Sequence, residues 1–306
     1  MSKIAIIGAG FVGSTAAYSL LIQGAAEEIA IVDIHREKAH GEAMDLEHGM
    51  QFVSNCRITY SNKYDVCRDA DIIIVCAGAH QKPGETRLDL VQKNAAIFKE
   101  MIPNITKHNK ECVFLIVSNP VDVLAYLTIK YSKFPANKVI GSGTTLDTAR
   151  FRHLLGKYFK VNPASVHAYI LGEHGDSEFP VWSTANVAGI HISKLKGYDK
   201  KKINKIFNDT KKAAYEVIAK KGATYYAIGL AITKIVKAIL SDQDTVLPVS
   251  SLLKNYNNVS DVCLSVPCVL GKSGVKKQLL MPFNKEEKIY FNKSAEILKG
   301  YIRKVK

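Results

Sequence analysis

Short apolar runs alternate with longer amphipathic segments along the first 141 residues of the chain. The runs have the length of β-strands, and the segments between them carry apolar residues at helical spacing. Strands that alternate with helices form parallel sheets, so this half predicts an α/β fold, a doubly wound parallel sheet with helices on both faces. The predicted strands span residues 3–7, 29–33, 58–60, 71–76, 113–117 and 138–141.

The pattern changes after about residue 142. No repeat, low-complexity tract or linker separates the two halves, so we predict two domains in close contact, 1–142 and 143–306. The second domain is of the α+β class, and a substrate cleft is expected between the two. Its predicted elements are a helix at 146–159, short strands near 166–171, two helices within 201–240, strands at 245–251 and 262–270, and a closing helix at 285–304.

Three glycines follow the first strand in the sequence GAGFVG. Gly8 permits a tight turn, Gly10 lets the backbone approach a pyrophosphate, and Gly13 lets the next helix pack close to the sheet. The helix start then directs its positive end at the phosphates. Asp33 ends the second strand, where a carboxylate accepts hydrogen bonds from a ribose hydroxyl and repels a ribose phosphate. This Rossmann-type pattern predicts NAD as the cofactor.

The net charge of +14 changes the picture little, because the whole excess falls in residues 190–306. The lysines there are dispersed between apolar positions at helical spacing, and few aromatic residues lie among them. A solvated helix face explains this pattern better than a nucleic-acid groove, which combines clustered basic residues with stacking aromatic rings. We therefore expect no specific nucleic acid as a partner, only a weak, salt-sensitive attraction to polyanions.

The longest apolar runs are far shorter than a membrane span, and Met1 lies two residues before the first strand. These features predict no membrane association, no targeting peptide and a cytoplasmic location. The cysteines show no paired Cys-x-x-Cys spacing, which predicts reduced thiols and no metal site. They are Cys56, Cys67, Cys76, Cys112, Cys263 and Cys268.

Four polar residues are candidates for the chemistry. His174 lies between glycines directly after a short predicted strand, and histidine is the side chain best suited to exchange a proton near neutral pH. Asp147 could hold its second ring nitrogen, and Arg150, one helical turn further on, suits a substrate carboxylate. Arg87 follows a polar Pro-Gly stretch of the kind found in mobile lids. The spacing alone does not bring residues 147 and 174 together.

Several long motifs in a fixed order resemble those of the bacterial-type L-lactate dehydrogenase family along nearly the whole chain. The motifs are GAGFVGS, AHQKPGETRLDLVQKN, VSNPVDV, GSGTTLDTARFR, LGEHGDSEFPVWS and KKGATYYAIG. The resemblance implies reversible, NADH-dependent reduction of pyruvate to L-lactate, a reaction of glycolysis and fermentation.

The resemblance also implies roles for individual residues. His174 would donate a proton to the pyruvate carbonyl and Asp147 would orient it, while Arg150 would bind the carboxylate. Arg87 would move in with the closing loop and polarise the carbonyl. Asn119 and Thr224 would line the substrate pocket. The positions that match cofactor contacts are Val12, Lys38, Tyr64, Gly78, Ala79 and Asn119.

Malate dehydrogenase is the nearest rival, because the resemblance implies the same fold and the same histidine, aspartate and arginine roles for it. Its substrate carries a second carboxylate, which those enzymes meet with an arginine, whereas Gln81 stands at that position here. A neutral amide leaves the second carboxylate without a counter-charge in a closed pocket, at a cost of several kcal/mol. Gln81 therefore favours pyruvate and lactate.

Two further residues indicate regulation. Arg152 and His167 match positions that bind fructose 1,6-bisphosphate across a subunit interface in the allosteric bacterial enzymes. Cations gathered at a symmetric interface repel one another, so a polyanion would favour the assembled, active state. The resemblance thus implies the bisphosphate as an effector and a homotetramer as the assembly.

Two hypotheses from other classes stay open at this point. The chain could keep the fold and the cofactor yet serve as a scaffold, although an intact set of His174, Asp147, Arg87 and Arg150 argues against this. It could also bind nucleic acid through residues 190–306, although the dispersed charge argues against that.

Overall fold

The computed structural model describes residues 2–80 and 84–305. Its first half contains six parallel strands that match the predicted ones to within one residue at either end. They run in the order β6-β5-β4-β1-β2-β3, which is the doubly wound arrangement. The strands are β1 Lys3–Ile7, β2 Glu28–Val32, β3 Arg57–Ser61, β4 Ile72–Val75, β5 Val113–Ile116 and β6 Val139–Gly141.

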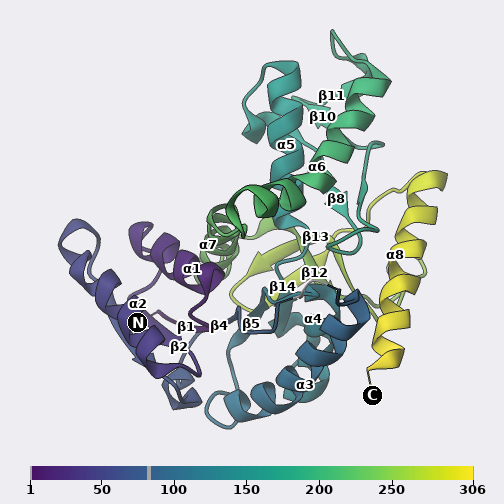
Figure 1. Ribbon diagram of the computed structural model, residues 1–306. Helices are drawn as coiled ribbons and strands as arrows, with labels where there is room; N and C mark the ends of the chain where they lie inside the picture. The colour runs from purple at the N-terminus through teal and green to yellow at the C-terminus, as the bar shows by residue number, and fades with distance from the viewer. Residues whose placement is uncertain (1, 81–83, 306) are drawn as a thin grey trace.

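Helices cover both faces of this sheet, as the alternating pattern predicts. The helices of the first half are α1 Phe11–Ile22, α2 Arg36–His48, α3 Arg87–Thr106 and α4 Val121–Ser132. Figure 1 shows α3 and α4 together on one face, while α1 lies on the other beside a helix of the second half, α7 Tyr226–Leu240. The loops that follow the carboxyl ends of the strands lie at the edge of the sheet, between the helices of one face and those of the other.

The second half adds the remaining elements. Its other helices are α5 Thr145–Phe159, α6 Lys200–Lys221 and α8 Lys285–Lys304. Its short strands are β7 Val166–His167, β8 Ile170–Leu171, β9 Phe179–Pro180, β10 Asn186–Val187 and β11 Ile190–His191. Three longer strands follow, β12 Thr245–Leu252, β13 Cys263–Gly271 and β14 Gly274–Gln278. Single 3-10 turns span Met50–Phe52, Tyr64–Cys67, Ala136–Lys138, Pro163–Ser165 and Ile192–Lys194.

The sheet is larger than the apolar pattern of the first half predicts. Strand β12 pairs with β6 through Ser250 and Gly141, and β13 and β14 continue the ladder beyond it, all antiparallel. Within the described residues this gives one sheet of nine strands that takes material from both halves. A lone β6 would be an open edge with unpaired backbone groups, and the second half covers it.

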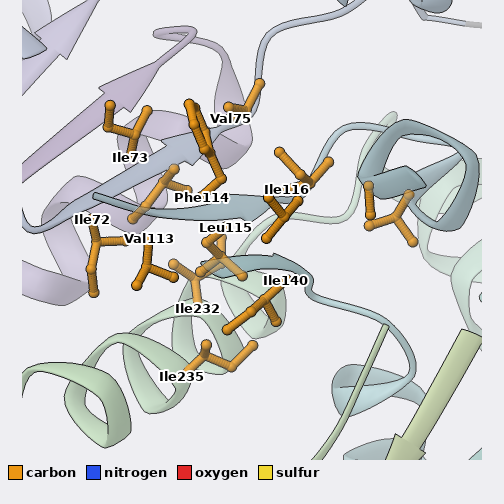
Figure 2. Packing of buried hydrophobic residues seen from close by; sticks show 14 of the residues in the cluster. Ile72, Ile73, Val75, Val113, Phe114, Leu115, Ile116, Ile140, Ile232 and Ile235 are labelled. Carbon is orange, nitrogen blue, oxygen red and sulfur yellow. The ribbon is translucent and has the colours of Figure 1, made fainter. Parts of the chain in front are cut away.

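Helix α7 also crosses from the second half to the first. Figure 2 shows its Ile232 and Ile235 packed among the side chains of β4, β5 and β6, including Ile140. On its α1 side, the buried Thr233 hydroxyl donates a hydrogen bond of 2.8 Å to Ser19. One large cluster of buried apolar side chains therefore extends through both halves, and a smaller one around Phe151 and Leu155 lies within the second half. The division at residue 142 stays a prediction.

Two other expectations meet structural tests here. All six cysteines are free thiols, as predicted, and burial raises the pKa of the Cys67 thiol to about 12. In the part of the chain that the structure describes, no helix is both long and apolar enough to cross a bilayer.

Candidate active site

The turn after β1 is built from the three predicted glycines. Gly8 has φ +101°, and a Cβ there would meet the backbone nitrogen of Ala77 at 2.7 Å. A Cβ on Gly13 would lie 1.9 Å from the Gly8 carbonyl oxygen, so only glycine lets α1 start this close to β1. Gly10 differs, because a Cβ there would have no described heavy atom within 4 Å. The open space at Gly10, before the first turn of α1, fits a pyrophosphate held by backbone N–H groups.

Asp33 lies just past the end of β2, beside this turn. Its Oδ2 accepts a hydrogen bond of 2.8 Å from the Ala9 backbone N–H, and its Oδ1 accepts one of 2.9 Å from His35. Each carboxylate oxygen has a second lone pair, so these bonds fix the orientation of Asp33 and leave it able to accept from a ribose hydroxyl. The geometry therefore fits the cofactor that the sequence predicts.

A cavity of about 720 Å³ runs from this turn to the second half of the chain. It brings together most of the predicted site residues, although they come from separate elements. The predicted residues in its wall are Gly10, Val12, Gly13, Lys38, Gly78, Ala79, Arg87, Asn119, Asp147, Arg150, His174 and Thr224.

The remaining predicted residues have other places. Gly8 and Asp33 do not line the cavity: Gly8 is in the turn after β1, and Asp33 accepts a hydrogen bond from that turn at Ala9. Tyr64 lies in a 3-10 turn packed on the core and is also not part of the cavity wall. Arg152 and His167 also lie outside the cavity. Gln81 falls outside the described residues.

His174 and Asp147 are in direct contact. The His174 Nδ1 and the Asp147 Oδ2 are 2.6 Å apart, and the Asp147 Oδ1 accepts a hydrogen bond of 2.8 Å from the Arg150 Nη1. Asp147 is only 4 % exposed. Because α5 carries Asp147 and Arg150 at i and i+3, one helix face presents both side chains to the cavity.

A second acid fixes the backbone of the histidine. Asp122, in the first turn of α4, accepts a hydrogen bond of 2.8 Å from the His174 N–H. Burial raises the pKa of the Asp122 carboxyl to about 6. The histidine is thus held at its ring by α5 and at its main chain by α4, and its Nε2 is left as the nitrogen that can exchange a proton with a ligand.

The charge of this pair follows from its surroundings. Burial alone would lower the pKa of His174, but the adjacent Asp147 carboxylate outweighs it, with smaller contributions from Glu178 and Asp122, and raises the pKa to about 9. Burial opposes ionisation of Asp147 as well, yet His174 and Arg150 hold the pKa of that carboxyl below its usual value. At neutral pH the site therefore holds an imidazolium, a carboxylate and a guanidinium.

Arg87 is the first residue of α3, directly after the polar stretch for which a mobile lid is expected, and that mobility stays a prediction. The helix starts there because Thr86 and Asp89 form a reciprocal capping box. The Arg87 guanidinium bonds the buried Glu173 carboxylate, and its Nη2 donates to the His174 carbonyl at 3.4 Å. It lies so close to Gly175 that a Cβ there would be 2.4 Å from Nη2. Arg87 is thus held against the loop of residues 172–178, called the histidine loop below, and its action on a carbonyl stays a prediction.

Sequence reasoning missed a buried side-chain amide that joins the loop after β4 to the loop after β5. Asn94, on α3, accepts a hydrogen bond of 2.7 Å from the Ala79 N–H and donates one of 2.7 Å to the Asn119 carbonyl. It also missed Glu173, which holds Arg87, and Glu178, which lines the cavity. The available signal for Asn94 was a polar residue at an apolar position of an amphipathic helix. For Glu173 and Glu178 the sequence offered only their closeness to His174 in the chain.

Comparison with known proteins agrees with this geometry. Residues 2–141 match the family model of the lactate/malate dehydrogenase NAD binding domain, and residues 144–306 match that of the lactate/malate dehydrogenase alpha/beta C-terminal domain. The chain belongs to the lactate/malate dehydrogenase family. It is therefore an NAD-dependent 2-hydroxy acid dehydrogenase by family, and the open space at Gly10 fits that cofactor.

Individual members of the lactate/malate dehydrogenase family are similar over almost their full length. The chain is 50% identical over 308 residues to an L-lactate dehydrogenase of Acetivibrio thermocellus, covering 99% of this chain and 97% of that protein. It is 50% identical over 304 residues to one of Clostridium botulinum, covering 98% and 95%. The ligand-bound crystal structure of a minor L-lactate dehydrogenase from Enterococcus mundtii superposes with a TM-score of 0.97 at 41% identity, covering 100% of this chain and 98% of that one.

Proposed function

We propose that this protein is an L-lactate dehydrogenase, which reduces pyruvate to L-lactate with NADH and catalyses the reverse reaction. The observation that carries the proposal is the 2.6 Å contact between His174 and Asp147, with Arg150 on the other carboxylate oxygen, in one cavity with the dinucleotide turn. The curated relatives at 50% identity bear the same name, which supports the proposal.

The proton donor is His174. NAD, when bound in its reduced form, supplies the hydride that reaches the carbonyl carbon. As negative charge develops on the carbonyl oxygen, the Nε2 of His174 donates its proton to that oxygen, and Asp147 stabilises the ring while it is charged. Since its pKa is about 9, His174 is protonated and ready for reduction at neutral pH. Lactate oxidation uses the neutral ring as the base.

Two guanidinium groups complete the proposed site. Arg150 binds the substrate carboxylate with its planar fork while Asp147 holds one of its nitrogens. Arg87 polarises the carbonyl oxygen from the start of α3, and Asn119 and Thr224 close the wall around the substrate. Gln81 offers no counter-charge to a second carboxylate, so the proposal specifies pyruvate over oxaloacetate.

Steady-state kinetics of two variants test the proposal. Arg87→Gln removes a charge that acts mainly on the developing oxyanion, so kcat is expected to fall by about 10²-fold or more. Arg150→Lys loses the bidentate fork, so KM for pyruvate is expected to rise much more than kcat falls. Wild-type protein that reduces oxaloacetate better than pyruvate, or two variants with near wild-type pyruvate kinetics, would contradict it.

We further propose that fructose 1,6-bisphosphate activates the enzyme in a homotetramer, in keeping with a role in glycolysis and fermentation. Arg152, on α5, and His167, on the neighbouring β7, provide two basic side chains outside the cavity. The Arg152 Nε is held by the Ala168 carbonyl at 2.8 Å, and its guanidinium lies over the Tyr169 ring. Pyruvate saturation curves and sedimentation, each with and without the bisphosphate, test this. Superimposable curves would exclude activation.

A further inference from the structure

Glu178 is a buried acid that the proposed reaction does not use. It lies four residues after His174, is only 7 % exposed, and lines the cavity. Among residues 2–80 and 84–305, its carboxyl has no hydrogen-bond partner, whereas the nearby Glu173 bonds both Arg87 and Ser177. Because Glu178 lines the cavity and no hydrogen bond to a described residue ties its carboxyl, the carboxyl can interact with a molecule that enters the cavity.

The surroundings of Glu178 place it within the charged cluster. One side-chain atom of each of three residues, a ring nitrogen of His174 and a carboxylate oxygen of Asp147 and of Glu178, lies within 4.8 Å of the other two. Helix α5 contributes charge on one side, and helix α6 on the other. The titratable and charged groups that face Glu178 from these elements and from the histidine loop are Asp147, Arg150, His174, Lys211 and Tyr215.

Two carboxyl groups this close in a buried site do not both ionise readily. Asp147 is the one that ionises more readily, because His174 and Arg150 contact its carboxylate directly. Burial first, and Asp147 second, raise the pKa of Glu178 to about 8. At neutral pH the cluster of Asp147, His174, Arg150 and neutral Glu178 therefore carries one net positive charge, which matches a monoanionic keto acid.

We propose that Glu178 is a positioning residue that couples substrate binding to its own protonation: its acid form admits the substrate carboxylate, and its anionic form repels it. The inference rests on the proposed reduction of a 2-oxo acid. An ionised Glu178 would cancel the net charge of the cluster and bring a second carboxylate to the wall beside Arg150. Substrate binding then takes up a proton at alkaline pH, and apparent affinity follows the fraction of protein with neutral Glu178.

The test measures the dissociation constant of oxamate, a non-reducible isostere of pyruvate, from the NADH-bound protein by fluorescence between about pH 6.5 and pH 9. For the wild type the constant is expected to rise about tenfold from pH 7 to pH 9, as the neutral fraction of Glu178 falls. Glu178→Gln keeps the shape and cannot ionise, so it escapes this loss. Because the missing carboxylate also lowers the pKa of His174, which offsets part of the gain, the variant is expected to bind oxamate about fivefold more tightly than the wild type at about pH 9.

The sign of this difference is decisive. If the Glu178 anion acted only by keeping His174 protonated, its loss would weaken oxamate binding at high pH, and the variant would bind less tightly than the wild type. Equal or weaker binding by Glu178→Gln at about pH 9 would overturn the proposal. Glu216→Gln, which removes a carboxylate from the exposed face of α6, is the matched control and is expected to follow the wild-type curve.

A second variant keeps the test independent of how Glu178→Gln folds. Lys211→Met removes a cation that favours the anion of Glu178, so the rise of the oxamate constant is expected to move to higher pH. An unmoved rise would count against the proposal. NADH binding by each variant verifies its fold.

Wild-type protein that reduces no pyruvate at about pH 7 refutes the proposed function itself. That result is distinct from a flat pH profile of oxamate binding in an active enzyme, which refutes only the role of Glu178.

Discussion

His174 owes its charge to one neighbour at the residue scale. The Asp147 carboxylate offsets the burial that would otherwise keep the imidazole neutral, and it does so from 2.6 Å in a buried position. The same carboxylate orients Arg150 through its other oxygen. One side chain thus sets both the proton donor and the carboxylate-binding group, which makes Asp147 the residue on which the proposed site depends most.

Asp147→Asn tests this dependence. Without the carboxylate, the pKa of His174 falls to its usual value or lower, and most of the imidazole is neutral at about pH 8. We expect kcat/KM for pyruvate at that pH to fall at least about tenfold, with a smaller loss near pH 6. Steady-state rates across this pH range measure the effect. A loss of equal size at every pH would mean that Asp147 does not set the charge of His174. Asp209→Asn, an exposed acid on α6, serves as the control.

At the scale of the element, the turn between β1 and α1 separates two uses of glycine. Gly13 is required by packing, because any Cβ would collide with the Gly8 carbonyl oxygen. Gly10 has no such neighbour and faces the cavity. The two positions lie in the same turn, so they form a natural pair for separating folding from cofactor binding.

Gly10→Ala and Gly13→Ala are therefore expected to fail differently. Gly10→Ala should keep the wild-type melting temperature and weaken NADH binding, because its methyl group occupies space that the pyrophosphate needs. Gly13→Ala should lower the free energy of unfolding by about 2 kcal/mol or more, because α1 must move away from β1. Thermal melts and NADH titrations compare the two. The assignment fails if both variants lose stability equally.

At the scale of the whole molecule, the two halves share a sheet and a core. Strands β12 to β14 extend the sheet from β6, and α7 packs its Ile232 and Ile235 against strands of the first half. Such shared burial makes the halves unfold together, since neither retains a covered sheet alone. The cavity forms where they meet, which is why residues from both halves line it.

Thr233→Val tests the contact between α7 and α1. The change keeps the shape and removes the hydroxyl that bonds Ser19, which leaves a buried polar group without that partner. We expect the free energy of unfolding to fall by about 1–2 kcal/mol while the denaturant transition stays single. Thr233→Ser, which retains the hydroxyl, should lose less. Two separate transitions in the wild type would show that the halves fold independently.

The stability of the whole chain should also depend on pH in a defined direction. His174 and Glu178 both have pKa values above those of their unfolded forms, about 9 and about 8. Their stabilisation is therefore complete below the unfolded values of 4.5 and 6.5, falls progressively as the pH rises, and is lost once the pH passes about 8 for Glu178 and about 9 for His174. Asp147 has a lowered pKa, so its contribution is lost as the pH falls below its usual range. Urea unfolding across this range measures both limbs; stability that increases from about pH 7 to pH 9 would contradict the assignment.

The sequence by itself determined the elements and the cofactor. Apolar runs of strand length, the spacing of Gly8, Gly10 and Gly13, and Asp33 act locally, so the strands of the first half and the dinucleotide turn could be predicted from residues close in the chain. Motif resemblance extended this to the proposed roles of His174 and Arg150, which local spacing could not justify.

The tertiary structure alone decided what depends on approach between distant segments. The joining of β12 to β6, the capture of Arg87 by Glu173 and the closeness of Glu178 to Asp147 arise from chain crossings that no local pattern encodes. The charge of His174 belongs to this second group, because an ionisation depends on the distance and burial of its neighbours and not on their order in the sequence.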